Sequence, residues 1–244
     1  MNILTWNCQG AFRKKYPLIA TFKPDLAVIQ ECETLEKITW KHGMQPGQSL
    51  WFGDKPTKGV GIFSWTTCWF QVHESYDPAI RYCIPLEITA PISFRAIAVW
   101  AMDDPKDRFS YSAQVYQAIG RYREFILGGD TIVLGDFNSN ARTTPSSRIG
   151  NYTTLNNNLY DLWLSSAYHI HTLEKQGKER RATYYQGRKL EHGRHIDYIY
   201  VPNRWLRGLK SVAIGNPQEW LEHSDHCPVQ VEIQPPSSRQ AFQG

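Results

Sequence analysis

The chain has 244 residues, of which 41% are hydrophobic, so it holds enough apolar side chains for one substantial core. The formal net charge is +4, a mild excess that suits an anionic substrate without identifying one. The 5 cysteines contain no C-x-x-C pair, which argues against a disulfide framework or a zinc knuckle and favours a reducing compartment. No apolar run approaches membrane-spanning length and no signal-peptide pattern opens the chain. We therefore expect a cytoplasmic protein that is not inserted in a membrane.

The first half of the chain reads as short strands with one helix among them. Residues 2–6 and 26–30 are apolar strands, and residues 16–22 between them have the pattern of a short helix. Further strand-like stretches, divided by Gly, Pro, Asp and Thr turn signals, follow at 61–65, 68–72, 82–88 and 94–100. These four stretches predict an antiparallel meander.

The second half alternates helices and strands. Residues 110–127 form the strongest helix candidate, because apolar side chains recur at helical spacing and Gly128-Gly129 stops the pattern. The other expected elements are a helical stretch at 155–164 and strands at 131–134, 196–201, 209–214 and 229–233. Helices and strands alternate only in places, so we expect two packed sheets with helices outside rather than one parallel sheet. The prediction is a single domain over residues 1–234, followed by a polar, disordered tail at 235–244.

Short polar motifs stand at the ends of the predicted strands. In chain order they are Thr5-Trp6-Asn7, Gln30-Glu31, Gly135-Asp136-Phe137-Asn138, Ile196-Asp197-Tyr198 and Ser224-Asp225-His226. Each string is common by itself. Together they provide the acids, amides and imidazole that phosphoryl chemistry requires.

Glu31 is the first candidate for a metal ligand. It closes an otherwise apolar strand, where a carboxylate facing the interior is costly unless it is paired or binds a cation. Mg²⁺ uses one or two protein carboxylates and leaves its other positions to water and substrate phosphate. Asn7 could add its amide oxygen, although a turn residue is an equally good interpretation of Asn7 alone.

The Asp-x-Asn motif predicts a pair of polar side chains on one side of the chain. An extended backbone would present Asp136 and Asn138 together and place Phe137 in the core. Asp136 could then orient or deprotonate an attacking water, and Asn138 could donate to a phosphate oxygen. An ordinary turn remains the alternative for this string.

Asp197 and His226 form the third predicted feature. Asp197 alternates with Ile196 and Tyr198, and a carboxylate inside a strand needs a partner, for which an imidazole is suitable. Such a pair would fix the tautomer of His226 and favour the imidazolium beside a phosphate. The other histidines are interpreted as surface or packing residues.

Taken together, the motifs resemble the endonuclease/exonuclease/phosphatase superfamily, the DNase I-like and exonuclease III-like phosphoesterases, over nearly the whole chain. The resemblance implies a four-layered α/β sandwich, in which two packed mixed β-sheets are flanked by helices. It also implies Mg²⁺ or Mn²⁺ at Glu31 and Asn7 with Asp225 beside the metal, Asp136 serving the nucleophilic water, and a histidine held by an aspartate.

Two departures distinguish the chain from abasic-site nucleases of this superfamily. Those enzymes carry Gln-Glu-Thr-Lys where this chain has Gln30-Glu31-Cys32-Glu33, and a tyrosine or histidine where it has Trp100. Tyr111 could take the aromatic role, or it could pack at the start of a helix. We therefore expect only a weak preference for abasic DNA.

The sequence predicts a Mg²⁺-dependent nuclease that cleaves DNA, or RNA, to leave a 5′-phosphate and a 3′-hydroxyl. The residues expected to bind the substrate are Arg13, Lys14, Tyr111 and Arg194. One alternative is a phosphatase or phosphodiesterase for a lipid headgroup or a small phosphate ester. Another is a binding module without catalysis, against which the intact acids and histidine argue. No obligate protein partner is implied.

Overall fold

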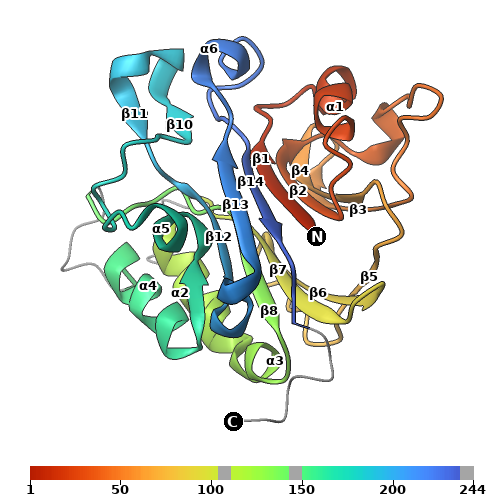
Figure 1. Cartoon of the computed structure of the whole chain (residues 1–244). Coiled ribbons are helices and arrows are strands. Elements are labelled where there is room, and N and C mark those ends of the chain that lie inside the picture. Colours follow the sequence, from red (N-terminus) through yellow and green to blue (C-terminus); the bar gives the residue numbers. More distant parts are fainter. Residues whose placement is uncertain (104–110, 143–149, 237–244) are drawn as a thin grey trace.

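The computed structural model describes residues 1–103, 111–142 and 150–236, and these form two six-stranded mixed sheets with helices on the outside (Figure 1). The first sheet has the strand order β13-β14-β1-β2-β4-β3. Its strands are β1 (Asn2–Asn7), β2 (Leu26–Cys32), β3 (Gln48–Lys55), β4 (Lys58–Ser64), β13 (Leu209–Ile214) and β14 (Val229–Ile233). Only β1 and β2 are parallel neighbours in it; the other pairs are antiparallel.

The second sheet has the order β5-β6-β7-β8-β12-β9. Its strands are β5 (Trp69–Val72), β6 (Cys83–Ala90), β7 (Phe94–Trp100), β8 (Thr131–Asp136), β9 (Leu164–Ser166) and β12 (Asp197–Pro202). A separate ribbon consists of β10 (Tyr184–Tyr185) and β11 (Gly193–Arg194).

Helices cover the outer face of each sheet, which makes four layers (Figure 1). The helices are α1 (Phe12–Ala20), α2 (Ser112–Arg121), α3 (Arg123–Leu127), α4 (Tyr152–Asp161), α5 (Ala167–Thr172) and α6 (Pro217–Trp220). Short 3₁₀ turns lie at η1 (Leu35–Lys37), η2 (Gln186–Arg188), η3 (Leu190–His192) and η4 (Asn203–Gly208). Side chains of α1 and α6 pack on the first sheet, and side chains of α2, α3 and α4 pack on the second. The predicted four-layered sandwich is confirmed.

Side chains alternate along the strands between the inter-sheet core and the outer layers. In β1, Ile3 packs between the sheets and Leu4 packs under the helices. In β8, Leu134 packs between the sheets and Val133 packs against the helices. Because this period is two, the last residues of β1 and β8 both point into the space between the sheets.

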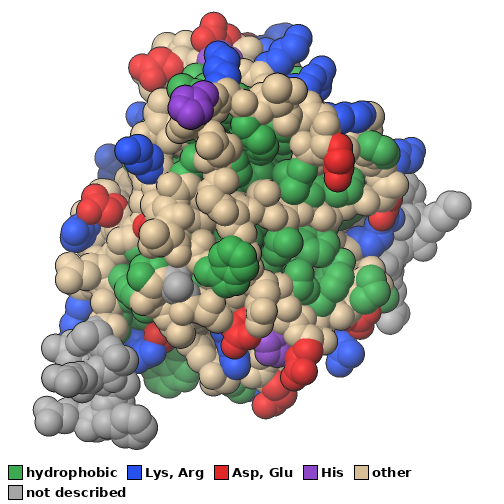
Figure 2. Space-filling model, turned by 90° about the vertical axis from the view of Figure 1, so that its right-hand side faces the viewer, with side chains coloured by type: hydrophobic (Ala, Val, Ile, Leu, Met, Phe, Trp, Pro, Cys, Tyr) green, Lys and Arg blue, Asp and Glu red, His purple; other side chains and the backbone are tan. Residues whose placement is uncertain are grey.

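The edges of the two sheets meet on the side of the molecule that Figure 2 shows, where apolar side chains reach the surface among charged ones. There β3 and β5 are the edge strands of their sheets. The backbone N–H of Phe70 in β5 donates to Oε1 of Gln48 in β3 over 2.7 Å. Side-chain bonding therefore ties the two edges without joining them into one sheet.

Several expected elements differ from the observed ones. The stretch expected as one meander is divided, because its first strand pairs in one sheet and the other three in the second. The helix expected at 110–127 is broken into α2 and α3 at Tyr122, whose φ of −96° and ψ of 18° leave the helical region. Ser110, its expected first residue, lies outside the described residues, as does 237–244 of the expected tail. Strand β3 was not expected at all.

The first helix starts at Phe12, four residues before the expected start, because a distant side chain caps it. The Glu33 carboxylate accepts the N–H groups of Phe12 and Arg13 over 2.6 and 3.1 Å. A cap supplied from the distant loop after β2 leaves no signal beside the helix itself. Within the described ranges, no helix is both long and apolar enough to cross a lipid bilayer.

Candidate active site

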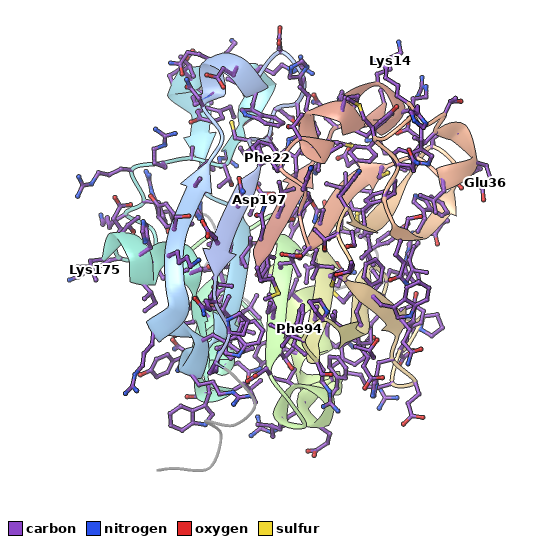
Figure 3. The ribbon with its side chains drawn as sticks, turned by 45° about the vertical axis from the view of Figure 1, so that its right-hand side comes forward. Lys14, Phe22, Glu36, Phe94, Lys175 and Asp197 are labelled. Atoms are coloured by element: carbon purple, nitrogen blue, oxygen red, sulfur yellow. The ribbon has the colours of Figure 1, made fainter. Side chains whose placement is uncertain are left out.

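A cavity of about 590 Å³ opens where β1, β2 and β8 end and β12 begins. Its walls come from both sheets, from the β10–β11 ribbon and from the loop before β14. The lining residues are Asn7, Gln9, Glu31, Lys58, Tyr111, Asn138, Ser139, Tyr184, Gln186, Arg194, Ile196, Asp225 and His226. In Figure 3, Asp197 lies inside the molecule near the junction of the sheets, whereas Lys14 projects outward from α1.

Asp136 is held by two amide side chains. Nδ2 of Asn7 donates to its Oδ2 over 3.0 Å, and the backbone N–H of Asn138 donates to its Oδ1 over 2.9 Å. Nδ2 of Asn138 donates to Oδ2 over 3.3 Å and to the Ala101 carbonyl over 2.8 Å. The Asp136 carboxylate is therefore fixed in orientation.

The environment of Asp136 also makes it a base that can act near neutral pH. Burial, and then the negative charge of Asp197, raise the pKa of Asp136 to about 7. The charge of His226 and the bond from Asn7 oppose that shift. A carboxylate with a pKa near the working pH is suited to accept a proton from water.

The backbone at Asn138 differs from the extended conformation expected for the Asp-x-Asn motif. Its φ is 48°, in the left-handed region, and β8 ends two residues earlier. The turn still brings Asn138 beside Asp136 and leaves Phe137 fully buried, as expected. Both amide hydrogens of Asn138 are used, so donation to a phosphate oxygen would require it to release Ala101 or Asp136.

His226 and Asp197 form the expected pair. Nδ1 of His226 donates to Oδ2 of Asp197 over 2.9 Å, and Nε2 lies 4.0 Å from Oδ2 of Asp136. Burial alone would favour the neutral imidazole, but the carboxylates of Asp197 and Asp136 outweigh it and raise the pKa of His226 to about 9. The ring is thus an imidazolium at neutral pH, and His226 lines the cavity.

The loop that carries His226 is anchored to the end of β1. Oγ of Ser224 donates to the Asn7 carbonyl over 2.7 Å and accepts the backbone N–H of His226 over 3.0 Å. Nε1 of Trp6 donates to the His226 carbonyl over 2.9 Å. On the other side, the Tyr184 ring lies 4.7 Å from the His226 ring. The position of the imidazole is therefore fixed from both sheets.

Glu31 lies at a bulge, where the register of β2 against β4 shifts between Gln30 and Cys32. Its φ is 56°, and its side chain is 20% exposed. The side chain lines the cavity and is paired, which is the condition expected from the sequence for a carboxylate at this position. There its Oε2 accepts a bond of 2.6 Å from Nζ of Lys58.

Two carboxylates and an amide oxygen could hold a divalent cation. Glu31, Asp225 and Asn7 all line the cavity, and burial, together with the nearby charge of Glu31, raises the pKa of Asp225. Oδ1 of Asn7 accepts the N–H of Gln9 over 3.0 Å and keeps a second lone pair. An all-oxygen set that includes two carboxylates is the kind of site that Mg²⁺ or Mn²⁺ prefers.

A second group also has a geometry that could hold a metal. Ligand atoms of Asp136, Asp197 and His226 all lie within 4.8 Å of one another, and the three residues are buried. However, a protonated imidazole does not bind a metal, and the pKa of His226 is raised. We therefore favour Glu31 and Asp225 as the carboxylates of the metal site.

Backbone strain gathers around the cavity. Gln9, Glu31, Tyr111 and Asn138 all line it, and their φ angles are 52°, 56°, 53° and 48°. Left-handed backbone at residues other than glycine costs free energy and is common at functional sites. The strain is an independent indication that this cavity is the active site.

The expected substrate-binding residues divide into two groups. Tyr111 and Arg194 line the cavity, and Tyr111 stands immediately before α2. Arg13 and Lys14 are not among the described residues that line it; Nη1 of Arg13 donates to Glu33 over 2.7 Å. Direct binding by Arg13 and Lys14 at the cavity therefore has no support from the geometry.

Sequence reasoning missed part of the cavity wall, namely Gln9, Lys58, Ser139, Gln186 and Ile196. Most of them stand in loops or turns, where no periodic pattern predicts which way a side chain points. Gln186 was near enough to the basic and aromatic segment before Asp197 to be suspected. Lys58 had no such signal.

The cysteines agree with the expectation of free thiols. All five are buried and free, and Cys8, Cys32 and Cys227 pack under the helices of the first sheet.

Trp100 is 5% exposed and its ring lies 4.9 Å from that of Tyr82, so it packs in the core.

The sequence profile of the Endonuclease/Exonuclease/phosphatase family matches residues 4–226. The chain belongs to this family. The prediction of a phosphoester hydrolase is thereby confirmed. A sequence comparison with curated proteins gives no match.

Solved structures of nucleases and phosphatases share the fold of this family member. A 3′ phosphatase from Neisseria, bound to a product DNA hairpin, is 24% identical with a TM-score of 0.72, and 96% of this chain and 99% of that one are covered. A 3′-5′ exonuclease from Neisseria meningitidis is 24% identical with a TM-score of 0.71, over 96% and 100% of the two chains. An AP endonuclease from Archaeoglobus fulgidus is 18% identical with a TM-score of 0.68, over 96% and 99%. At these identities the likeness establishes the fold.

Proposed function

We propose that this family member is a Mg²⁺- or Mn²⁺-dependent phosphodiesterase that cleaves DNA to leave a 5′-phosphate and a 3′-hydroxyl. The observation that carries the proposal is the contact between buried Asp136 and His226, which lines the cavity. The base and the imidazolium lie 4.0 Å apart, and each is oriented by a buried partner, Asn7 or Asp197. Two further carboxylates line the same cavity.

Glu31 and Asp225, with Oδ1 of Asn7, would hold the cation. When bound, a divalent ion supplies positive charge that polarises the phosphate and makes it easier to attack. Among the described lining residues these are the two carboxylates, and no sulfur ligand accompanies them. The donor set therefore fits a hard ion.

Asp136 would accept the proton of the attacking water. Its carboxylate is oriented by amide donors and has a pKa raised to about 7, so it can take up a proton under physiological conditions. His226 would stabilise the negative charge that develops on the phosphate, because it lines the cavity while its Nδ1 is held by Asp197.

The β10–β11 ribbon would contact the polynucleotide. Tyr184 offers a half-buried ring, and Arg194 offers a guanidinium that donates to Gln186 over 3.2 Å. Stacking on an aromatic ring and neutralisation of phosphate by cations are the usual means of binding nucleic acid. That one structural relative was solved with a DNA product supports DNA over RNA as the first substrate.

A second candidate is the removal of a terminal 3′ phosphate from DNA. The cavity carries a cation on each of two walls, Lys58 and Arg194, which suits a phosphate with two negative charges. One relative with this fold is a 3′ phosphatase. The same catalytic groups serve phosphomonoesters and phosphodiesters.

Incubation of the purified protein with a panel of substrates tests the proposal. The panel holds plasmid, single-stranded DNA, abasic duplex, duplex with a 3′ phosphate, RNA, a sphingolipid and an inositol phosphate, each with Mg²⁺, with Mn²⁺ and with EDTA. Asp136→Asn serves as the control for contaminating nucleases. We expect metal-dependent cleavage of DNA that the variant lacks. Cleavage of a lipid or inositol phosphate, with all nucleic acids intact, would overturn the substrate assignment and leave the metal chemistry standing.

A further inference from the structure

Lys58 is a cavity residue to which the proposed cleavage of phosphodiesters has given no role. It opens β4 and brings Nζ to 2.6 Å from Oε2 of Glu31, one of the two carboxylates proposed to bind the metal. The side chain is 55% exposed. It is the one lysine among the described residues that line the cavity.

The hairpin between β3 and β4 fixes the position of Lys58. Gly59, the next residue, pairs with Cys32 directly beyond the bulge at Glu31. A Cβ at Gly59 would lie 2.3 Å from the Phe52 carbonyl oxygen, so only glycine allows the hairpin to close here. The backbone of the hairpin therefore places Lys58 beside Glu31.

Arg194 and Lys15, two other cations near the cavity, bond to groups other than Glu31. Arg194 reaches the cavity from the β10–β11 ribbon, where it donates to Gln186. Nζ of Lys15 donates to the Cys8 carbonyl over 2.6 Å, and Lys15 is not among the described lining residues. On the wall that carries Glu31, Lys58 thus supplies the positive charge.

We propose that Lys58 is a substrate-binding residue that contacts the reacting phosphate and shares Glu31 with the metal. This inference rests on the proposed function. A cation bound to Glu31 repels the ammonium, and the flexible four-carbon stem of lysine lets it turn to a phosphate oxygen. Lys58 therefore opposes metal binding by the free protein and favours phosphate binding once the metal is present.

Three variants separate the effect of Lys58 on metal binding from its effect on phosphate binding. They are Lys58→Met, Lys58→Arg and Lys55→Met. Lys55 lies opposite Lys58 in the same hairpin, is exposed and does not line the cavity, so it is the matched control. Calorimetric titration of each protein with Mn²⁺, without substrate, measures metal affinity. Steady-state hydrolysis of a DNA duplex at saturating Mn²⁺ then measures KM and kcat.

We expect Lys58→Met to bind Mn²⁺ at least about fivefold more tightly, since even two unit charges at about 4 Å in water interact by about 1 kcal/mol and Mn²⁺ carries two charges. We expect its KM for DNA to rise by roughly five- to tenfold, because a phosphate contact is lost. Lys58→Arg keeps the charge and should restore KM, and Lys55→Met should resemble the wild type in both measurements.

Two outcomes would overturn the inference alone. Weaker Mn²⁺ binding by Lys58→Met would mean that the lysine only holds Glu31 in place. If Lys58→Met behaves like Lys55→Met in both measurements, the contact between Lys58 and Glu31 is an ordinary surface ion pair. A wild-type protein that neither binds Mn²⁺ or Mg²⁺ nor hydrolyses any phosphate ester would instead overturn the proposed function, and this inference with it.

Discussion

Asn7 and Asp136 are joined by a bond of 3.0 Å between the amide Nδ2 and the carboxylate Oδ2. Asn7 is the last residue of β1 in one sheet, and Asp136 is the last residue of β8 in the other. A second bond crosses the sheets nearby, from Nε2 of Gln30 in β2 to the Val99 carbonyl in β7, over 3.1 Å. The active site is therefore complete only when the two sheets are packed, so loss of sheet packing should abolish activity before the individual strands separate.

Replacement of Glu31 by glutamine should abolish metal-dependent hydrolysis and leave the fold intact. The change removes one charge from a side chain that is 20% exposed, so the free energy of unfolding should change by no more than about 0.5 kcal/mol. Hydrolysis of DNA with Mn²⁺ checks the loss of activity, and urea unfolding checks the stability of the fold. Glu36→Gln, an exposed acid in η1 outside the cavity, is the control. Full hydrolysis in the presence of EDTA would contradict the prediction.

Replacement of Asp197 by asparagine should lower kcat by roughly 10²–10⁴-fold with little change in KM, because it alters the protonation of His226 without removing a substrate contact. Asp197 is the main group that raises the pKa of His226 to about 9. The imidazolium exists below its pKa, so wild-type activity should fall as the pH rises through about 9. In Asp197→Asn that fall should move to lower pH.

The double variant with His226→Ala distinguishes pairing from independent action. If Asp197 acts through His226, removing Asp197 from a protein that already lacks the imidazole should cost little more. Independent effects of the two residues, which multiply in the double variant, would show that the 2.9 Å contact has no part in catalysis.

Glu179→Gln should destabilise the protein near pH 7 by about 1.5–3 kcal/mol, the range for hydrogen bonds to a charged group. The Glu179 carboxylate is nearly buried, accepts the N–H of Gly177 over 2.7 Å, and pairs with Nε2 of His169 at 3.1 Å. Burial opposes its ionisation, but the bonds from His169 and the backbone outweigh this and lower the pKa of Glu179.

The pH dependence of this destabilisation follows from the sign of the shift. Because the folded pKa lies below the ordinary value of 4.5, the contribution is present above that pH and is lost as the pH falls through the folded pKa. Urea unfolding at several pH values should therefore show a gap between wild type and Glu179→Gln that narrows in acid. Glu191→Gln, at an exposed site, is the control. A difference in unfolding free energy that stays constant with pH would show that the ionised Glu179 carboxylate is not the stabilising group.

The sequence predicted the centre of the site because strands have a fixed period. Asn7, Asp136 and Asp197 stand at strand ends, in phase with apolar neighbours that pack between the sheets, so alternation alone directs them to one place. The pairing of Asp197 with His226 followed from the need of a buried carboxylate for a partner. Both inferences used rules that hold for any strand.

The walls of the site could not be predicted in the same way. Glu31 lines the cavity at a bulge, and Lys58 reaches it from the first residue of β4, three residues before the strand expected at 61–65. Arg13 stood next to a motif in the sequence, yet its partner is Glu33, whose role in capping α1 depends on contact between distant segments. Bulges, turns and long-range caps are set by tertiary packing, which leaves little trace in local sequence.

The path of DNA over the surface can be tested through salt dependence. Each phosphate contact that is lost should lower the slope of log K against log salt by about 0.9 for duplex DNA. Arg194→Gln removes a cavity residue and should lower the slope by about one contact. Lys14→Gln removes an exposed charge that projects from α1, away from Asp197, and should change the slope less (Figure 3).

Binding of a labelled duplex, measured by anisotropy at several salt concentrations, gives both slopes. The measurement uses an Asp136→Asn background so that the duplex stays intact. The sequence alone predicted that Arg13, Lys14 and Arg194 all bind the substrate. Of these three, the structure places only Arg194 at the cavity. A lower slope for Lys14→Gln with none for Arg194→Gln would mean that DNA runs over α1 and that the β10–β11 ribbon does not contact its backbone.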